Sequence, residues 1–159
     1  MVLSQVHMSA LRGILSPGEI LDVLSPEYPL HTETWSAQKN RHPAWVLRPS
    51  TLLALQNTVK YLCQEDEIDF AVRSGGIGSS SASDIVLSMA AFDGFEFDPN
   101  SETVIVGVGQ TWGDVDRKIE KSAPGFAGLF SLITAPIFYE TDVTRQYLKW
   151  LVREPHMSA

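Results

Sequence analysis

Hydrophobic positions along the chain recur with two different periods, and these periods predict alternating strands and helices. Residues 44–47 form a short apolar run that ends before Pro49, which is typical of a strand. Apolar residues then recur at helical spacing, which predicts a helix with Ser50 as its N-cap and an end near Gln64. The predicted buried stripe of this helix consists of Leu52, Leu55, Val59 and Leu62.

The second half of this pattern predicts further strands and a second long helix. Strand-like apolar runs cover residues 70–73, 85–89 and 103–108. A turn is predicted at 98–101, where Asp, Pro, Asn and Ser follow one another. The helix is predicted to begin near Thr111, because Thr111 and Asp114 have the spacing of a capping box, with Asp in place of Glu. The inner face of that helix is predicted to carry Trp112, Val115 and Ile119. This order of elements predicts an α+β domain, a mixed sheet with flanking helices.

The two ends of the chain differ in character from this middle part. Residues 1–40 form a leader that prolines break into short pieces. Two short helices are predicted within it, one lined by Leu11, Ile14 and Leu15 and the other by Ile20, Leu21 and Leu24. Residues 126–159 form an apolar tail and a final amphipathic helix. The predicted domain therefore covers residues 41–125.

Composition and charge exclude several classes of partner. The chain has 12 basic and 19 acidic residues and no cluster of Lys or Arg, which argues against binding of nucleic acid or of an anionic membrane. Cys63 is the only cysteine, so no intrachain disulfide forms, and we expect it to be a small core side chain. We see no signal peptide and no apolar run near the ~20 residues that span a bilayer, so we expect a cytoplasmic protein. The four histidines lack ligand spacing, so no metal site is expected and surface or core roles are favoured.

The segment with the most chemical information directly follows the strand at 70–73. Three glycines lie within four positions there, and glycine lets a ligand approach the backbone closely. Successive N–H groups can then bind phosphate oxygens, with serine hydroxyls as further donors and an arginine as a positive charge. A flexible Gly/Ser surface loop is the alternative, and the spacing fits neither a P-loop nor a dinucleotide fingerprint. The predicted cofactor-binding residues are Arg73, Ser74, Gly75, Gly76, Ile77, Gly78, Ser79 and Ser80.

Four ordered motifs resemble the oxygen-dependent, FAD-linked oxidoreductases of the berberine-bridge-enzyme-like family, which carry a PCMH-type FAD-binding domain. The motif at 73–78, Arg-Ser-Gly-Gly-Ile-Gly, resembles the family's loop for the FAD pyrophosphate. The segment at 106–115 is similar to the family's Gly-Ala-Gly-x-x-Trp-Gly-Asp-Val element, and the strands at 43–50 and 85–89 also resemble family strands. The resemblance implies the N-terminal part of a PCMH-type domain, with FAD as its cofactor.

Two departures from the family change what the resemblance implies. Ile77 occupies the position of a histidine that bonds covalently to the flavin in many relatives, so non-covalent FAD is expected. The family also continues with a glycine-rich segment, a substrate domain and a C-terminal contact to the cofactor, and these are not found after residue 125. We therefore expect a truncated member with an incomplete FAD domain, whose residues 126–159 are a candidate remnant of the substrate domain. No residue is identified as the catalytic base.

Three functional hypotheses follow. The resemblance implies a FAD-linked oxidoreductase that oxidises a small organic molecule in a secondary-metabolite pathway. The alternative is a non-catalytic remnant or small interaction protein, whose uncovered core surface and sheet edges predict self-association. The third hypothesis is a small binding module that uses the same glycine-rich loop for another phosphate ligand.

Overall fold

A computed structural model describes residues 4–34, 36–74, 81–100 and 103–122. The helices are α1 (Gln5–Ile14), α2 (Tyr28–Thr32), α3 (Leu52–Gln64) and α4 (Trp112–Ser122), with short 3₁₀ helices at Pro17–Glu19 and Ala37–Lys39. The strands are β1 (Ile20–Asp22), β2 (Trp45–Leu47), β3 (Phe70–Arg73), β4 (Ile85–Ser88), β5 (Phe95–Asp98) and β6 (Thr103–Val106). The predicted α+β class is confirmed.

Four of the strands form one mixed sheet in the order β1-β2-β4-β3. Strand β4 runs parallel to both β2 and β3, whereas β1 pairs antiparallel with β2. All four residues of β4 are buried, as expected for a central parallel strand that is covered on both faces. The remaining strands, β5 and β6, form a separate antiparallel pair.

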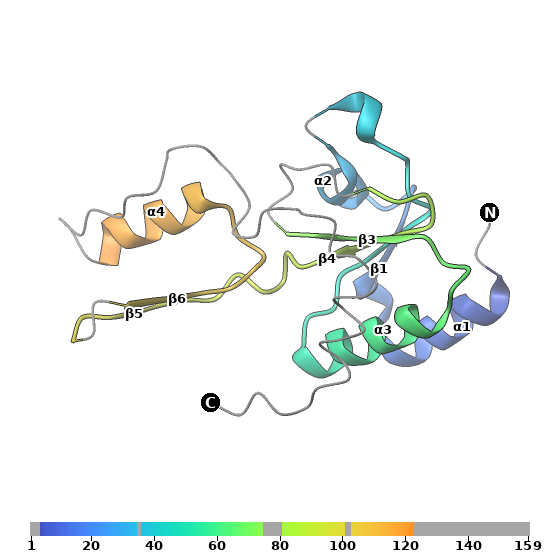
Figure 1. Ribbon diagram of the computed structural model, residues 1–159, viewed down its shortest axis with the longest axis horizontal. Helices are drawn as coiled ribbons and strands as arrows, with labels where there is room; N and C mark the ends of the chain where they lie inside the picture. The colour runs from blue at the N-terminus through green and yellow to red at the C-terminus, as the bar shows by residue number, and fades with distance from the viewer. Residues whose placement is uncertain (1–3, 35, 75–80, 101–102, 123–159) are drawn as a thin grey trace.

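Helices cover both faces of the four-stranded sheet (Figure 1). Alternate residues of a strand point to opposite faces, so β4 contributes to two separate clusters. Ile85 and Leu87 pack with residues of α1 and α3, including Leu11 and Leu62. Val86 packs on the other face with Val46 and Leu21, next to Tyr28 of α2.

The antiparallel pair carries its own helix, α4, which lies along β5 and β6 in Figure 1. Val115 and Ile119 form the buried face of α4, and Trp112 is half-buried on its first turn. The turn predicted after β5 begins as expected, because the Asp98 side chain accepts a hydrogen bond from the N–H of Asn100 at 2.9 Å.

The predicted helix over Ile20, Leu21 and Leu24 is wrong, because this segment forms strand β1. The backbone N–H of Arg48 donates to the carbonyl of Glu19 at 2.7 Å, and pairing with β2 continues from there. Leu21 is buried against the sheet, while Leu24 lies beyond the strand and is 86% exposed. Three residues are too few to show a strand period, so only the pairing partner decides their conformation.

Two details of the predicted helix at 52–64 are corrected. The N-cap is Thr51, whose side chain accepts from the N–H of Ala54 at 3.1 Å, and Ser50 instead donates its N–H to Glu19 at 2.6 Å. The buried face consists of Thr58, Val59, Leu62 and Cys63, with Leu55 partly buried beside it. Leu52, on the first turn, is 74% exposed and does not belong to the core cluster. Cys63 is a core side chain, as expected.

The segment expected to be a leader contributes to the main core. Met8, Leu11 and Leu15 of the helix region predicted there belong to the same cluster as the sheet residues Leu47 and Leu87. The short helix predicted before Pro17 is confirmed as α1. The tail and helix predicted for residues 126–159 lie outside the described residues.

We expect Leu62→Ala to lower the free energy of unfolding by about 2–5 kcal/mol, because Leu62 is fully buried and its truncation leaves a cavity. The matched control is Leu52→Ala on the same helix, which should change stability by less than about 0.5 kcal/mol. Urea unfolding of both variants measures the difference. Equal losses would contradict the assignment of the buried face of α3.

Candidate functional site

The parallel strands β2, β4 and β3 end at the same edge of the sheet, and the glycine-rich segment begins at that edge. Ligands of open α/β sheets bind outside the carboxyl ends of the strands, where the loops diverge. Of the predicted cofactor-binding residues, Arg73 ends β3 and Ser74 follows it. Residues 75–80 lie outside the described residues, so their role stays a prediction.

Ser74 connects the glycine-rich segment to the second glycine motif. Its hydroxyl donates a hydrogen bond to the carbonyl of Val108, which lies between β6 and α4. The N–H of Met89, at the end of β4, donates to the carbonyl of Arg73 at 2.8 Å. Two motifs that are 34 residues apart in the chain are therefore adjacent at the carboxyl edge.

The glycines of the second motif are required by close backbone packing. The N–H of Gly107 donates to the carbonyl of Gly94 at 2.7 Å, and that of Gly109 to the carbonyl of Phe92 at 2.8 Å. A Cβ atom at Gly107 would collide with the backbone of Phe92, and one at Gly109 with the backbone of Met89. Only glycine fits at both positions.

The far end of the glycine-rich segment is also fixed by hydrogen bonds. The hydroxyl of Ser81 accepts from the N–H of Arg41 at 2.8 Å. The N–H and hydroxyl of Ser83 both donate to one carboxylate oxygen of Asp69, at 2.8 and 2.9 Å, and Arg41 lies 3.2 Å from the same oxygen. Sequence reasoning missed this group, because no local pattern relates a charged residue at 41 to one at 69.

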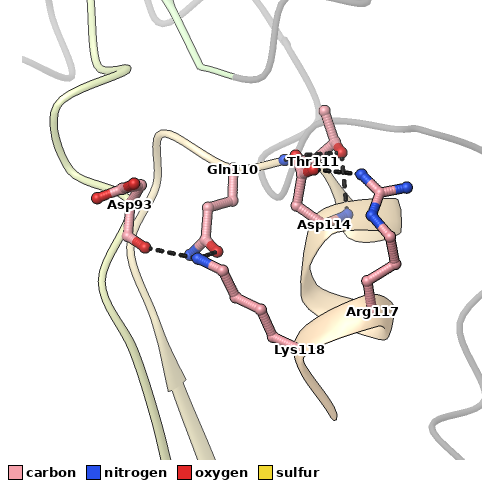
Figure 2. Close-up of polar contacts among 6 residues, drawn as sticks. All are labelled: Asp93, Gln110, Thr111, Asp114, Arg117 and Lys118. Atoms are coloured by element: carbon pink, nitrogen blue, oxygen red, sulfur yellow. Dashed lines mark hydrogen bonds and ion pairs between the residues drawn. The ribbon is translucent and has the colours of Figure 1, made fainter. Parts of the chain in front are cut away.

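The N-terminus of α4 is capped by its own side chains (Figure 2). One oxygen of Asp114 accepts from the N–H and hydroxyl of Thr111, at 3.0 and 2.6 Å, and the Thr111 hydroxyl accepts from the N–H of Asp114 at 3.2 Å. The predicted capping box is confirmed. These bonds to Thr111, together with the Arg117 guanidinium at 2.5 Å, lower the pKa of Asp114. A negative charge thus lies at this terminus, which disfavours a phosphate group there.

A buried amide joins α4 to the backbone of the antiparallel pair (Figure 2). Gln110 is 3% exposed, and its Nε2 donates to the carbonyls of Gly94 and Gly107 at 2.8 and 3.3 Å. Its Oε1 accepts from Nζ of Lys118 at 2.5 Å, and Lys118 also donates to the carbonyl of Asp93 at 2.9 Å. No local pattern indicates a role for Gln110, because a buried glutamine is recognised only from its partners.

Two side chains at the carboxyl edge contact α2. The guanidinium of Arg73 donates to the carbonyls of Leu30 and Glu33, at 2.5 and 3.2 Å. His31 is 6% exposed, and its Nδ1 lies 2.9 Å from the hydroxyl of Ser88. Burial, followed by the nearby cations Arg48 and Arg73, lowers the pKa of His31. A core role is thus observed for one of the four histidines.

Within the described ranges, no group of three or more His, Cys, Asp or Glu side chains is arranged to hold a metal ion. In the same part of the chain, no helix has both the length and the apolar character to cross a bilayer.

Comparison with known proteins agrees with this arrangement. Residues 43–132, more than half of the chain, match the family model described as FAD binding domain. The chain is similar to an FAD-linked oxidoreductase of Dictyostelium discoideum, with 28% identity over 93 residues, which is 57% of this chain and 20% of the relative. The chain therefore spans about a fifth of the length of this curated relative.

Solved structures show the same fold. Wild-type BBE-like 1 of Physcomitrella patens superimposes with a TM-score of 0.58 and 19% identity, over 70% of this chain and 26% of that one. The xylooligosaccharide oxidase of Myceliophthora thermophila C1, in complex with xylobiose, gives a TM-score of 0.59 and 17% identity, over 73% and 25%. The described residues thus form part of a PCMH-type fold, and span about a quarter of these proteins.

The lowered pKa of His31 predicts that the free energy of unfolding decreases as the pH falls. The fold favours the neutral imidazole, so the unfolded chain binds more protons once the pH drops below the usual value of 6.5. His31 should therefore cost no stability above about pH 7, and an increasing amount as the pH falls through 6.5. His31→Asn, which cannot be protonated, should reduce this loss when unfolding is measured in urea at pH 7.5 and 5.5.

The control for this measurement is His42→Asn. His42 is exposed and has a positive φ of 51°, which asparagine tolerates well. This variant is the reference for a change from histidine to asparagine at an exposed position. If His31→Asn lost stability on acidification as steeply as His42→Asn, the assignment of the acid loss to His31 would be wrong.

Proposed function

The chain belongs to the FAD binding domain family, whose model matches residues 43–132. On this basis we propose that it functions as a berberine-bridge-enzyme-like oxidoreductase, in the oxidation of a small organic molecule by bound FAD. The observation that supports this most directly is the contact between Ser74 and Val108. It joins the segment that resembles the pyrophosphate loop to the second glycine motif, at the edge of the sheet where ligands bind.

The described residues next to the glycine-rich segment are compatible with FAD. Ser74 begins the segment at the carboxyl edge, where its hydroxyl bonds to Val108. Ser81 lies toward the opposite, amino edge, where it accepts from the N–H of Arg41 ahead of β2. Backbone N–H groups of 74–80 and the hydroxyls of Ser79 and Ser80 would hold the pyrophosphate, in the manner of other anion-binding loops. The capped terminus of α4 with its negative Asp114 would not take part.

FAD, when bound, supplies the two-electron redox chemistry, and the protein's task is to hold and orient it. We propose non-covalent attachment, because Ile77 has no nucleophilic atom to bond the flavin. We propose a small organic molecule as the substrate, and one protein of similar fold is described as a xylooligosaccharide oxidase in complex with xylobiose. A secondary-metabolite pathway is our proposed setting and the cytoplasm our proposed location. No side chain of the chain is assigned as the catalytic base.

The second candidate function is that of a non-catalytic interaction protein. Large apolar side chains are exposed on several elements: Val6, Val23, Leu24, Leu30, Leu52, Leu53 and Ile105. Strand β3 also forms an edge of the four-stranded sheet. Exposed apolar side chains and the edge strands of a sheet favour association with a second chain.

We expect the purified chain, after incubation with FAD, to show a flavin absorption spectrum that moves to the supernatant on acid precipitation. Non-covalent FAD is released when the protein unfolds, whereas a covalent flavin would stay in the pellet and contradict the role given to Ile77. Titration with riboflavin, which lacks phosphate, should give much weaker binding than FAD. If FAD does not bind and ADP does, the third hypothesis, another phosphate ligand, is supported instead. If neither binds, the interaction protein is the better account.

A further inference from the structure

Helix α2 covers one face of the sheet, and its C-terminal end is held at the carboxyl edge by side chains of neighbouring strands. Arg73 and Ser88 are cross-strand partners in the register of β3 and β4. Arg73 binds the carbonyls of Leu30 and Glu33, and Ser88 binds the imidazole of His31. One register position of the sheet therefore supplies two separate contacts to α2.

The contact from Arg73 has a clear physical basis. The last carbonyls of a helix have no partner within the helix, and they carry the negative end of its dipole. A guanidinium offers donors in a fixed plane, so Nη1 and Nη2 reach Leu30 and Glu33 together. A lysine ammonium carries the same charge, but its three donors share one nitrogen on a flexible stem, so it lacks the two planar nitrogens that reach Leu30 and Glu33 and should hold α2 less firmly.

Helix α2 depends on such contacts, because it has only five residues. A helix of this length is not stable in isolation. At its N-terminal end, the hydroxyl of Tyr28 donates to the carbonyl of Pro43 at 2.5 Å. At its C-terminal end, Arg73 and the buried pair of His31 and Ser88 provide the contacts.

These contacts also bear on the proposed cofactor site. Ser74 follows Arg73 directly and bonds to Val108, so the residue that contacts α2 is next to the start of the glycine-rich segment. We propose that Arg73 is a positioning residue: its guanidinium holds α2 at the carboxyl edge and thereby fixes Ser74, and it does not supply the positive charge for the FAD phosphates. This proposal rests on the proposed function for its link to FAD, while the link between Arg73 and α2 stands on geometry alone.

The test compares Arg73→Lys with Arg73→Gln in the full chain. If the guanidinium acts through its geometry, both variants should weaken FAD binding by a similar factor, on the order of ten-fold, the size expected for loss of a charged contact at a helix terminus. In the absence of FAD, the backbone N–H groups within residues 28–33 should also exchange their hydrogens with solvent faster in both variants than in the wild type. FAD affinity is measured from flavin fluorescence at two salt concentrations, and exchange by mass spectrometry.

The opposite pattern would overturn the proposal. If Arg73→Lys binds FAD like the wild type, while Arg73→Gln binds weakly and loses salt dependence, Arg73 acts as a charge on the phosphates. Unchanged exchange of residues 28–33 in both variants would also contradict it. Wild-type protein that binds no FAD would refute the proposed function, whereas the exchange data would still decide whether Arg73 holds α2.

Two further variants complete the design. Ser88→Ala removes the partner of buried His31 without changing any charge, so it should accelerate exchange in α2 and weaken FAD binding in the same direction as Arg73→Lys. Arg48→Lys is the matched control, because Arg48 forms an ion pair with Glu27 at 2.7 Å that lysine can keep. It should leave both the exchange of α2 and the FAD affinity near wild-type values.

Discussion

Strand β4 pairs with β2 on one side and β3 on the other, and its side chains are buried on both faces. Ile85 and Leu87 anchor α1 and α3, while Val86 anchors the face covered by α2. Burial of four consecutive residues strongly disfavours a slip of register, because a shift by one residue would exchange the two faces. The position of every element around the sheet depends on this strand.

The same strand determines what lies at the carboxyl edge. Its register places Ser88 beside Arg73, so the end of β4 and the end of β3 together hold α2. Directly after β4, the backbone of residues 89–94 packs against Gly107 and Gly109 so closely that no side chain fits. At the start of the proposed cofactor site, Ser74 bonds to Val108 between these glycines, and Arg73 before it contacts the C-terminal end of α2. Few of these contacts involve residues close together in the chain.

Several of these features could be predicted from local sequence. The apolar runs of β2, β3 and β4 and the period of α3 follow from residues next to one another, and the capping box of Thr111 and Asp114 requires a spacing of only three. Strand β1 could not be predicted, because three residues carry no usable period and its conformation comes from pairing with β2. The exposure of Leu52 could not be predicted either, because its helical spacing is the same as that of the core residues Val59 and Leu62.

The sequence by itself determined the class of fold, the family and the segment proposed to bind FAD, because each rests on motifs within short stretches of chain. Only the tertiary structure decided which contacts the candidate residues make. Arg73 reaches Leu30 across 43 positions, and Ser74 reaches Val108 across 34. Gln110 is buried because the backbone at Gly94 and Gly107 converges on it. Such partners are set by strand order and register, and these depend on the burial of the whole sheet rather than on any local pattern.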